Sequence, residues 1–121
     1  MLAQVTPVLP AEDIERAKNF YTEKLGLSIV FESPQGILFS CEDGSSIFIY
    51  PHERTLATHT AASFVVQDVV AEMARLRERG VVFEDYDEPG LKTEDGLNQQ
   101  DEIKSTWFVD TEGNILGVVQ M

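Results

Sequence analysis

One pattern of hydrophobic and polar residues occurs twice along this chain. Residues 7–31 and 61–85 each hold an apolar stretch, an acidic residue followed by a branched aliphatic one (Asp13-Ile14 and Asp68-Val69), an amphipathic run, a glycine and a hydrophobic segment. The two copies lie about 55 residues apart, and self-similarity at a fixed offset is typical of a duplicated supersecondary unit. The pattern predicts a pseudo-symmetric protein with something held between its halves.

Each copy predicts a strand, a helix and then further strands. The first helix begins near Asp13 and ends at Gly26, because apolar residues recur every three or four positions and glycine favours the left-handed end of a helix. A second helix is predicted at 69–79. Strands are predicted at 3–9, 27–32, 36–41, 45–50, 61–67, 104–109 and 114–120, with an acidic loop between 84 and 102.

The length of 121 residues predicts one domain, and the repeat divides it into two modules. Module one covers about 1–51, a polar linker covers 52–60, and module two covers about 61–121. The segment Ile47 to Tyr50 is apolar on both strand faces. Both faces must therefore be covered, one by a helix and the other by a cavity or a partner.

The charge balance limits the classes of partner. A formal net charge of −12 argues against nucleic acid and anionic membrane surfaces, which both require basic patches, and it is compatible with a cationic ligand. No apolar run approaches the ~20 residues of a membrane span. The single cysteine, Cys41, excludes an internal disulfide and fits a reducing compartment. We therefore expect a cytoplasmic protein.

Two phrases give the chain a family resemblance. Asp13-Ile14 with Phe20-Tyr21 and Leu25-Gly26-Leu27, and the closing Asp110-x-x-Gly113-Asn114 before a terminal strand, resemble the vicinal oxygen chelate superfamily of glyoxalases, dioxygenases and antibiotic-resistance proteins. The nearest branch in appearance is that of the bleomycin-resistance proteins. The resemblance implies an α+β fold in which two βαβββ modules have curled mixed sheets that form a cleft, with the helices outside.

The resemblance also locates the metal ligands of the superfamily's enzymes. His or Glu is expected there at four strand positions, which in this chain are Thr6, Phe48, Ala61 and Gly117. Threonine is a poor ligand and the other three offer no side-chain donor. We therefore predict no metal and no other cofactor. A shifted metal site that uses His52 and His59 is the alternative.

The cleft implied by the resemblance gives the candidate site. Its predicted lining consists of aromatic walls and small residues that leave room: Phe39, Phe48, Tyr50, Ser63, Trp107 and Gly117. No catalytic residue is predicted. The leading hypothesis is a metal-independent, homodimeric protein that binds a cationic or aromatic small molecule, such as a drug that it sequesters. The alternatives are a metal-dependent lyase or dioxygenase with displaced ligands, and an interaction scaffold without a small ligand.

Overall fold

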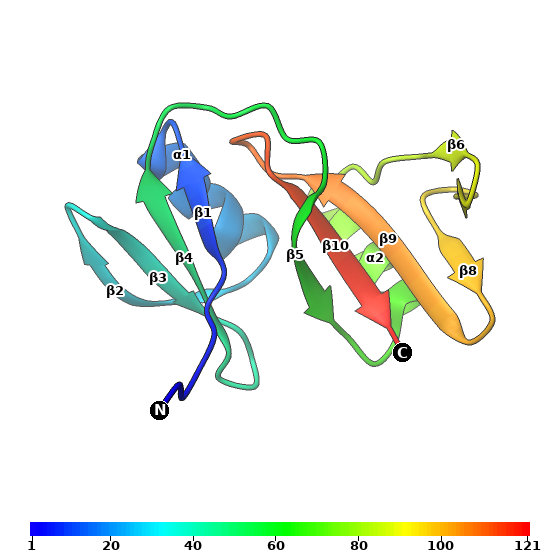
Figure 1. Ribbon diagram of the computed structural model, residues 1–121, viewed down its shortest axis with the longest axis horizontal. Helices are drawn as coiled ribbons and strands as arrows, with labels where there is room; N and C mark the ends of the chain where they lie inside the picture. Colours follow the sequence, from blue (N-terminus) through cyan, green and yellow to red (C-terminus); the bar gives the residue numbers. More distant parts are fainter. The chain divides into compact units, whose positions relative to one another are not determined.

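Each of the two four-stranded sheets of the chain has helical structure on one face and none on the other (Figure 1). The computed structural model describes residues 1–121. They divide into two compact units, Met1–Leu56 with Thr111–Asn114, and Ala57–Asp110 with Ile115–Met121. None of the helices is both long enough and apolar enough to span a membrane.

The first unit contains the first copy of the repeated pattern. In chain order its elements are β1 (Val8–Ala11), α1 (Ile14–Asn19), the π-helical turn η1 (Phe20–Lys24), β2 (Ser28–Ser33), β3 (Gly36–Ser40) and β4 (Ser46–Pro51). The strand order is β1-β4-β3-β2, in which β1 is parallel to β4 and the other pairs are antiparallel.

Capping and apolar spacing explain the helical segment of this unit. The Asp13 carboxylate accepts a hydrogen bond from the Arg16 amide at 3.0 Å, which satisfies a free N–H group of the first turn. Gly26 follows the helix with a φ of 78°, where a side chain would be strained. The face of α1 and η1 that carries Ala17, Tyr21 and Leu25 is buried. The core of the unit is completed by apolar residues of the sheet: Leu9, Ala11, Ile37, Phe39, Ile47 and Ile49.

The second unit repeats this order with a longer helix. Its main elements are β5 (Thr60–Val65), α2 (Val69–Glu78), β9 (Ile103–Val109) and β10 (Ile115–Gln120), and the sheet order is β5-β10-β9-β8. Between α2 and β9 lie β6 (Asp87–Glu88), β7 (Leu91–Lys92) and β8 (Asn98–Gln100). Asp68 caps α2 as Asp13 caps α1. The buried apolar side chains of the helix and sheet are Val69, Met73, Leu76, Phe108, Leu116 and Val118.

The predicted fold class is confirmed: two βαβββ-like modules with mixed sheets form an α+β protein. The first strand was placed wrongly, because it covers Val8–Ala11 and not 3–9. Of the segment before β1, only the end is bonded to β4. The Pro7 carbonyl accepts a hydrogen bond from the Phe48 amide, and the Thr6 hydroxyl is hydrogen-bonded to that of Ser46. The acidic segment 84–102, predicted to be a loop, contains three short strands.

A buried carboxylate holds the start of α1. Glu112 is 3% exposed and accepts hydrogen bonds from the Asp13 amide at 2.9 Å, from Arg16 Nε at 2.8 Å and from the Thr111 hydroxyl at 2.8 Å. Burial alone raises the pKa of Glu112. The bonds from Arg16, Asp13 and Thr111 outweigh it and lower that pKa from 4.5 to about 2. The segment Thr111–Asn114 thus belongs to the first unit, although both flanking strands belong to the second.

This lowered pKa makes the stability of the protein depend on pH. A carboxyl group with a lower pKa in the folded state stabilises that state above its unfolded pKa of 4.5, and the contribution is lost as the pH falls toward about 2. We expect Glu112→Gln to lower the free energy of unfolding by about 2 to 3 kcal/mol at pH 7. The difference from the native protein should shrink below pH 4.5.

Urea unfolding at a series of pH values measures this difference. Glu102→Gln is the matched control, because Glu102 is exposed and its removal should leave the free energy of unfolding unchanged at pH 7. A loss of stability in Glu112→Gln that stays constant from pH 7 to pH 3 would mean that the carboxylate charge has no role.

Candidate functional site

Five of the six predicted site residues lie on the sheet faces without a helix. In β4, Ile47 and Ile49 are buried on the helix side, so Phe48 and Tyr50, which alternate with them, lie on the other face and are half-buried. In β9, Trp107 alternates in the same way with buried residues. Gly117 is paired with both Trp107 and Ser63, which places all three side by side on the helix-free face.

Phe39 is placed differently. Its ring has no exposed surface and stacks on Tyr21 of η1 with centroids 5.4 Å apart. Phe39 is paired with Ile47, so it lies on the helix side of its sheet. The register of β3 against β4 decides this, because paired residues share a face. Phe39 packs in the core, and the candidate site is built without it.

The helix-free face of the first unit carries an apolar row. Val8, Phe48, Leu38 and Phe31 are in register across β1, β4, β3 and β2. Val8 and Phe31 are 56% and 50% exposed, although both side chains are large and apolar. An unbroken apolar row across four strands is unusual on a sheet face that meets water, and such surfaces typically mark a binding site.

The corresponding row of the second unit has small residues at its first two positions, Ser63 and Gly117, and Trp107 at the third. Val8 and Ser63 each precede a helix cap, Asp13 and Asp68, by the same number of residues, and they pair with Phe48 and Gly117 respectively. Phe48 is therefore replaced by glycine in the second copy. A Cβ atom on Gly117 would lie 2.6 Å from Ser63 Oγ and 3.4 Å from Trp107 Nε1. The absence of a side chain at Gly117 thus lets the hydroxyl and the indole approach one another across the sheet.

Trp107 forms an aromatic corner with Tyr86, a residue that the sequence reasoning missed. The rings meet edge to face with centroids 5.6 Å apart, and the Glu84 amide donates a hydrogen bond to the Trp107 carbonyl at 2.8 Å. Burial raises the pKa of Tyr86, and the negative charges of Glu84 and Glu88 raise it further. Carboxylates therefore lie near this aromatic pair. Tyr86 lay in a predicted loop, so neither strand parity nor helical spacing could assign it a partner.

The positions implied for a metal do not form a ligand set. Thr6 Oγ1 lies 3.2 Å from Ser46 Oγ, and the other positions are occupied by Phe48, Ala61 and Gly117. His52 and His59 are both exposed and belong to different units. No group of three or more His, Cys, Asp or Glu side chains could hold a metal ion. The donor chemistry of these residues does not fit the metal of the superfamily's enzymes.

Surface hollows occur elsewhere in the second unit. One of about 420 Å³ is lined by residues between 77 and 96, and one of about 660 Å³ by residues between 88 and 100. Neither includes Ser63, Trp107 or Gly117. These two hollows are therefore separate from the candidate site. That the helix-free faces of the two units line one cleft stays a prediction.

Sequence similarity comprises a family match near the N-terminus and a relative that matches most of the chain. Residues 4–36 match the family described as bleomycin resistance protein-like N-terminal. The uncharacterized protein YurT of Bacillus subtilis strain 168 is 29% identical over 126 residues, which cover 90% of this chain and 91% of that protein.

Solved structures match almost the whole chain. A lactoylglutathione lyase from Agrobacterium tumefaciens has a TM-score of 0.73 at 19% identity and covers 98% of this chain and 92% of its own. The fosfomycin resistance protein FosX from Mesorhizobium loti has a TM-score of 0.69 at 14% identity, with coverage of 100% and 93%. At these identities the match shows the fold alone, and it confirms the fold expected from the two sequence phrases.

Proposed function

Since the chain has the fold of the vicinal oxygen chelate superfamily and matches its bleomycin-resistance-like N-terminal family, we propose that it is a metal-independent small-molecule binding protein. Its ligand is a flat aromatic molecule that binds on the helix-free face of the second sheet. The observation that carries this proposal is the corner of Trp107 and Tyr86 beside the small residues Ser63 and Gly117. The two rings present apolar surface, and the small side chain of Ser63 beside them is exposed.

Electrostatics favours a positively charged ligand. Glu84 and Glu88 lie near enough to Tyr86 to raise its pKa, and the whole chain has a net charge of −12. A cation over an indole ring gains about 0.5 to 2 kcal/mol from the ring quadrupole. A flat organic cation would therefore combine stacking on Trp107 with attraction to the two carboxylates, whereas an anion of the same size would be repelled.

Binding without catalysis agrees with the side chains present. The implied ligand positions Thr6, Phe48, Ala61 and Gly117 supply no set of donors for a divalent ion, and no other cluster replaces them. The lactoylglutathione lyase and the fosfomycin resistance protein of the same fold are the basis of the alternative, an enzyme that recruits a metal through His52 or His59. Fold alone does not decide between the two activities.

Metal analysis tests the choice between binding protein and metalloenzyme. Protein purified without chelator and then dialysed should contain no stoichiometric zinc, nickel, manganese or iron in elemental analysis, because the four positions lack donors. One equivalent retained after dialysis would contradict the proposal. If that equivalent were lost in His52→Ala or His59→Ala, the metalloenzyme alternative would replace it.

Fluorescence of Trp107, the only tryptophan, tests the ligand proposal. Proflavine, a flat cation, should change the emission of Trp107 in a saturable manner, and an anthracene sulfonate of similar size should bind more weakly. Trp107→Ala should weaken proflavine binding by about 2 kcal/mol, which is roughly 30-fold in Kd, as measured by calorimetry. Equal binding of the cation and the anion would contradict the charge preference, and no binding of either would contradict the proposal.

The carboxylates allow a matched control of the charge preference. The double variant Glu84→Gln with Glu88→Gln should reduce the difference in affinity between proflavine and the anion. Added salt should have a similar effect, because it screens charges over roughly 8 to 10 Å. Glu78→Gln removes one negative charge at the C-terminal end of α2, and we expect the preference to be unchanged. Loss of preference in Glu78→Gln as well would assign it to net charge and not to this site.

We further propose that the chain is a homodimer, because the apolar row of the first unit leaves Val8 and Phe31 half exposed. Sedimentation at micromolar concentration should give about twice the chain mass of 13.5 kDa. Phe31→Asp should shift the protein toward monomer. Val30→Asp is the control, since Val30 is 55% exposed but lies in the β-bulge of β2, outside the paired row. A monomeric native protein, or equal effects of both variants, would contradict an interface on this row.

A further inference from the structure

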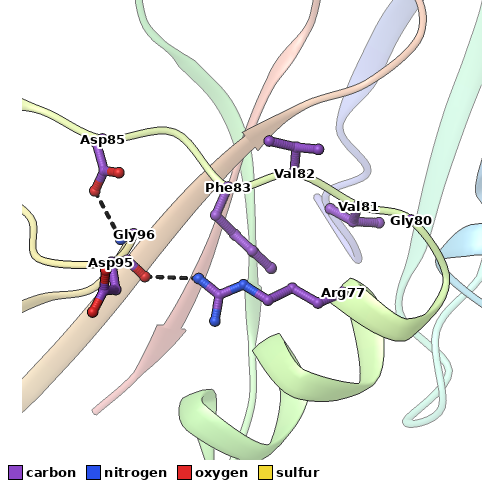
Figure 2. A pocket seen from close by; sticks show the side chains of 8 residues that line it. All are labelled: Arg77, Gly80, Val81, Val82, Phe83, Asp85, Asp95 and Gly96. Atoms are coloured by element: carbon purple, nitrogen blue, oxygen red, sulfur yellow. Dashed lines mark hydrogen bonds between the residues drawn. The ribbon is translucent and has the colours of Figure 1, made fainter.

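A second candidate site lies at the C-terminal end of α2, away from the Trp107 face. The hollow of about 420 Å³ there is within the range of small-molecule sites, roughly 300 to 1,000 Å³. Figure 2 shows the Arg77 side chain reaching from the helix across the hollow toward the turn at Asp95 and Gly96, with the Phe83 ring beside it. No lining residue is shared with the candidate site at Trp107.

The peptide group between Asp95 and Gly96 is hydrogen-bonded to two charged side chains of this hollow. Arg77 Nη2 donates a hydrogen bond to the Asp95 carbonyl at 2.7 Å, and the amide of the next residue, Gly96, donates to Asp85 Oδ1 at 2.8 Å (Figure 2). A guanidinium and a carboxylate are thus held on opposite edges of the same peptide plane. The Arg77 guanidinium also lies over the Phe83 ring, 5.2 Å from its centroid, which fixes it further.

Both charged groups retain unused bonding capacity. A guanidinium has five N–H donors, and the hydrogen bond to Asp95 uses one of those of Arg77. Asp85 Oδ1 accepts from both Thr93 Oγ1 and Gly96, whereas the second carboxylate oxygen of Asp85 has no such bond. The hollow therefore offers a fixed fork of donors at one side and a carboxylate oxygen at the other.

The remaining wall is apolar and uncovered. Val82 lines the hollow, and its side chain is 80% exposed. A ligand with only a negative charge would be repelled by the carboxylates of Asp85 and Asp95. A ligand with only a positive charge would be repelled by the Arg77 guanidinium. A ligand that carries both charges and an apolar group complements all three features.

We propose that this hollow binds a zwitterion of the α-amino acid type with an apolar side chain. The ligand carboxylate accepts hydrogen bonds from Arg77, its ammonium group donates to the free oxygen of Asp85, and its side chain covers Val82. Charge-assisted bonds at both ends make recognition depend on the two charges together. This site is independent of the function proposed for the Trp107 face.

Titration of the ¹⁵N-labelled full chain with L-leucine tests the proposal by NMR. The amides of Gly80, Val82 and Gly96 and the Arg77 Nε–H should shift in a saturable manner, with few shifts elsewhere. N-acetyl-L-leucine lacks the ammonium charge and L-leucinamide lacks the carboxylate, so each should bind about tenfold more weakly or worse. Equal affinity for either derivative, shifts scattered over the surface, or no shift with leucine would overturn the proposal.

Three variants, at Arg77, Arg79 and Asp85, test whether leucine binds in this hollow. Arg77→Lys keeps the charge but loses the planar fork, and it should weaken leucine binding about tenfold. Arg79→Lys makes the same change at the C-cap of α2, outside the hollow, and should leave the affinity unchanged. Asp85→Asn should weaken leucine binding while leaving the weak binding of N-acetyl-L-leucine unaltered. Loss of affinity in Arg79→Lys, or none in Arg77→Lys, would exclude Arg77 as the carboxylate partner.

Discussion

The Glu112 carboxylate is the interaction on which the first unit depends. It is almost fully buried, and a buried charge is stable only when it is paired and hydrogen-bonded. Arg16 supplies the opposite charge, while the Asp13 amide and the Thr111 hydroxyl supply further donors. These bonds attach the segment Thr111–Asn114 to the start of α1 and make residues about a hundred positions apart in sequence part of one unit. Removal of Arg16 would leave this carboxylate buried without its opposite charge.

The internal repeat creates two similar sheets with different helix-free faces. Each sheet buries one face under its helix, and the residues that alternate with that core are exposed on the other face. In the first unit this face carries Phe48 and its apolar neighbours, whereas the second copy has Gly117 at the corresponding place. The same module thus presents a bulky apolar row in the first unit and small residues beside Trp107 in the second. This asymmetry suits contact with another surface by the first and ligand binding by the second.

Acidic residues have at least three distinct roles in the chain. Glu112 is structural, Asp13 and Asp68 cap helices, and Asp85 holds a turn through its bonds to Thr93 and Gly96. The net charge of −12 is therefore not simply a means of solubility, because several carboxylates have fixed hydrogen-bond partners. Glu84, Glu88 and Asp85 are the carboxylates that we propose to contact ligands.

Sequence periodicity alone determined the repeated module, the caps at Asp13 and Asp68, and the left-handed glycine after the first helix, because each depends on local spacing and backbone conformation. Tertiary structure decided which strand face each aromatic residue occupies. Phe39 packs on the helix side because its neighbour across the sheet is Ile47, and the Tyr86–Trp107 contact joins a loop to a strand. Such pairings depend on strand register and chain folding between distant residues, which the spacing of apolar residues does not contain.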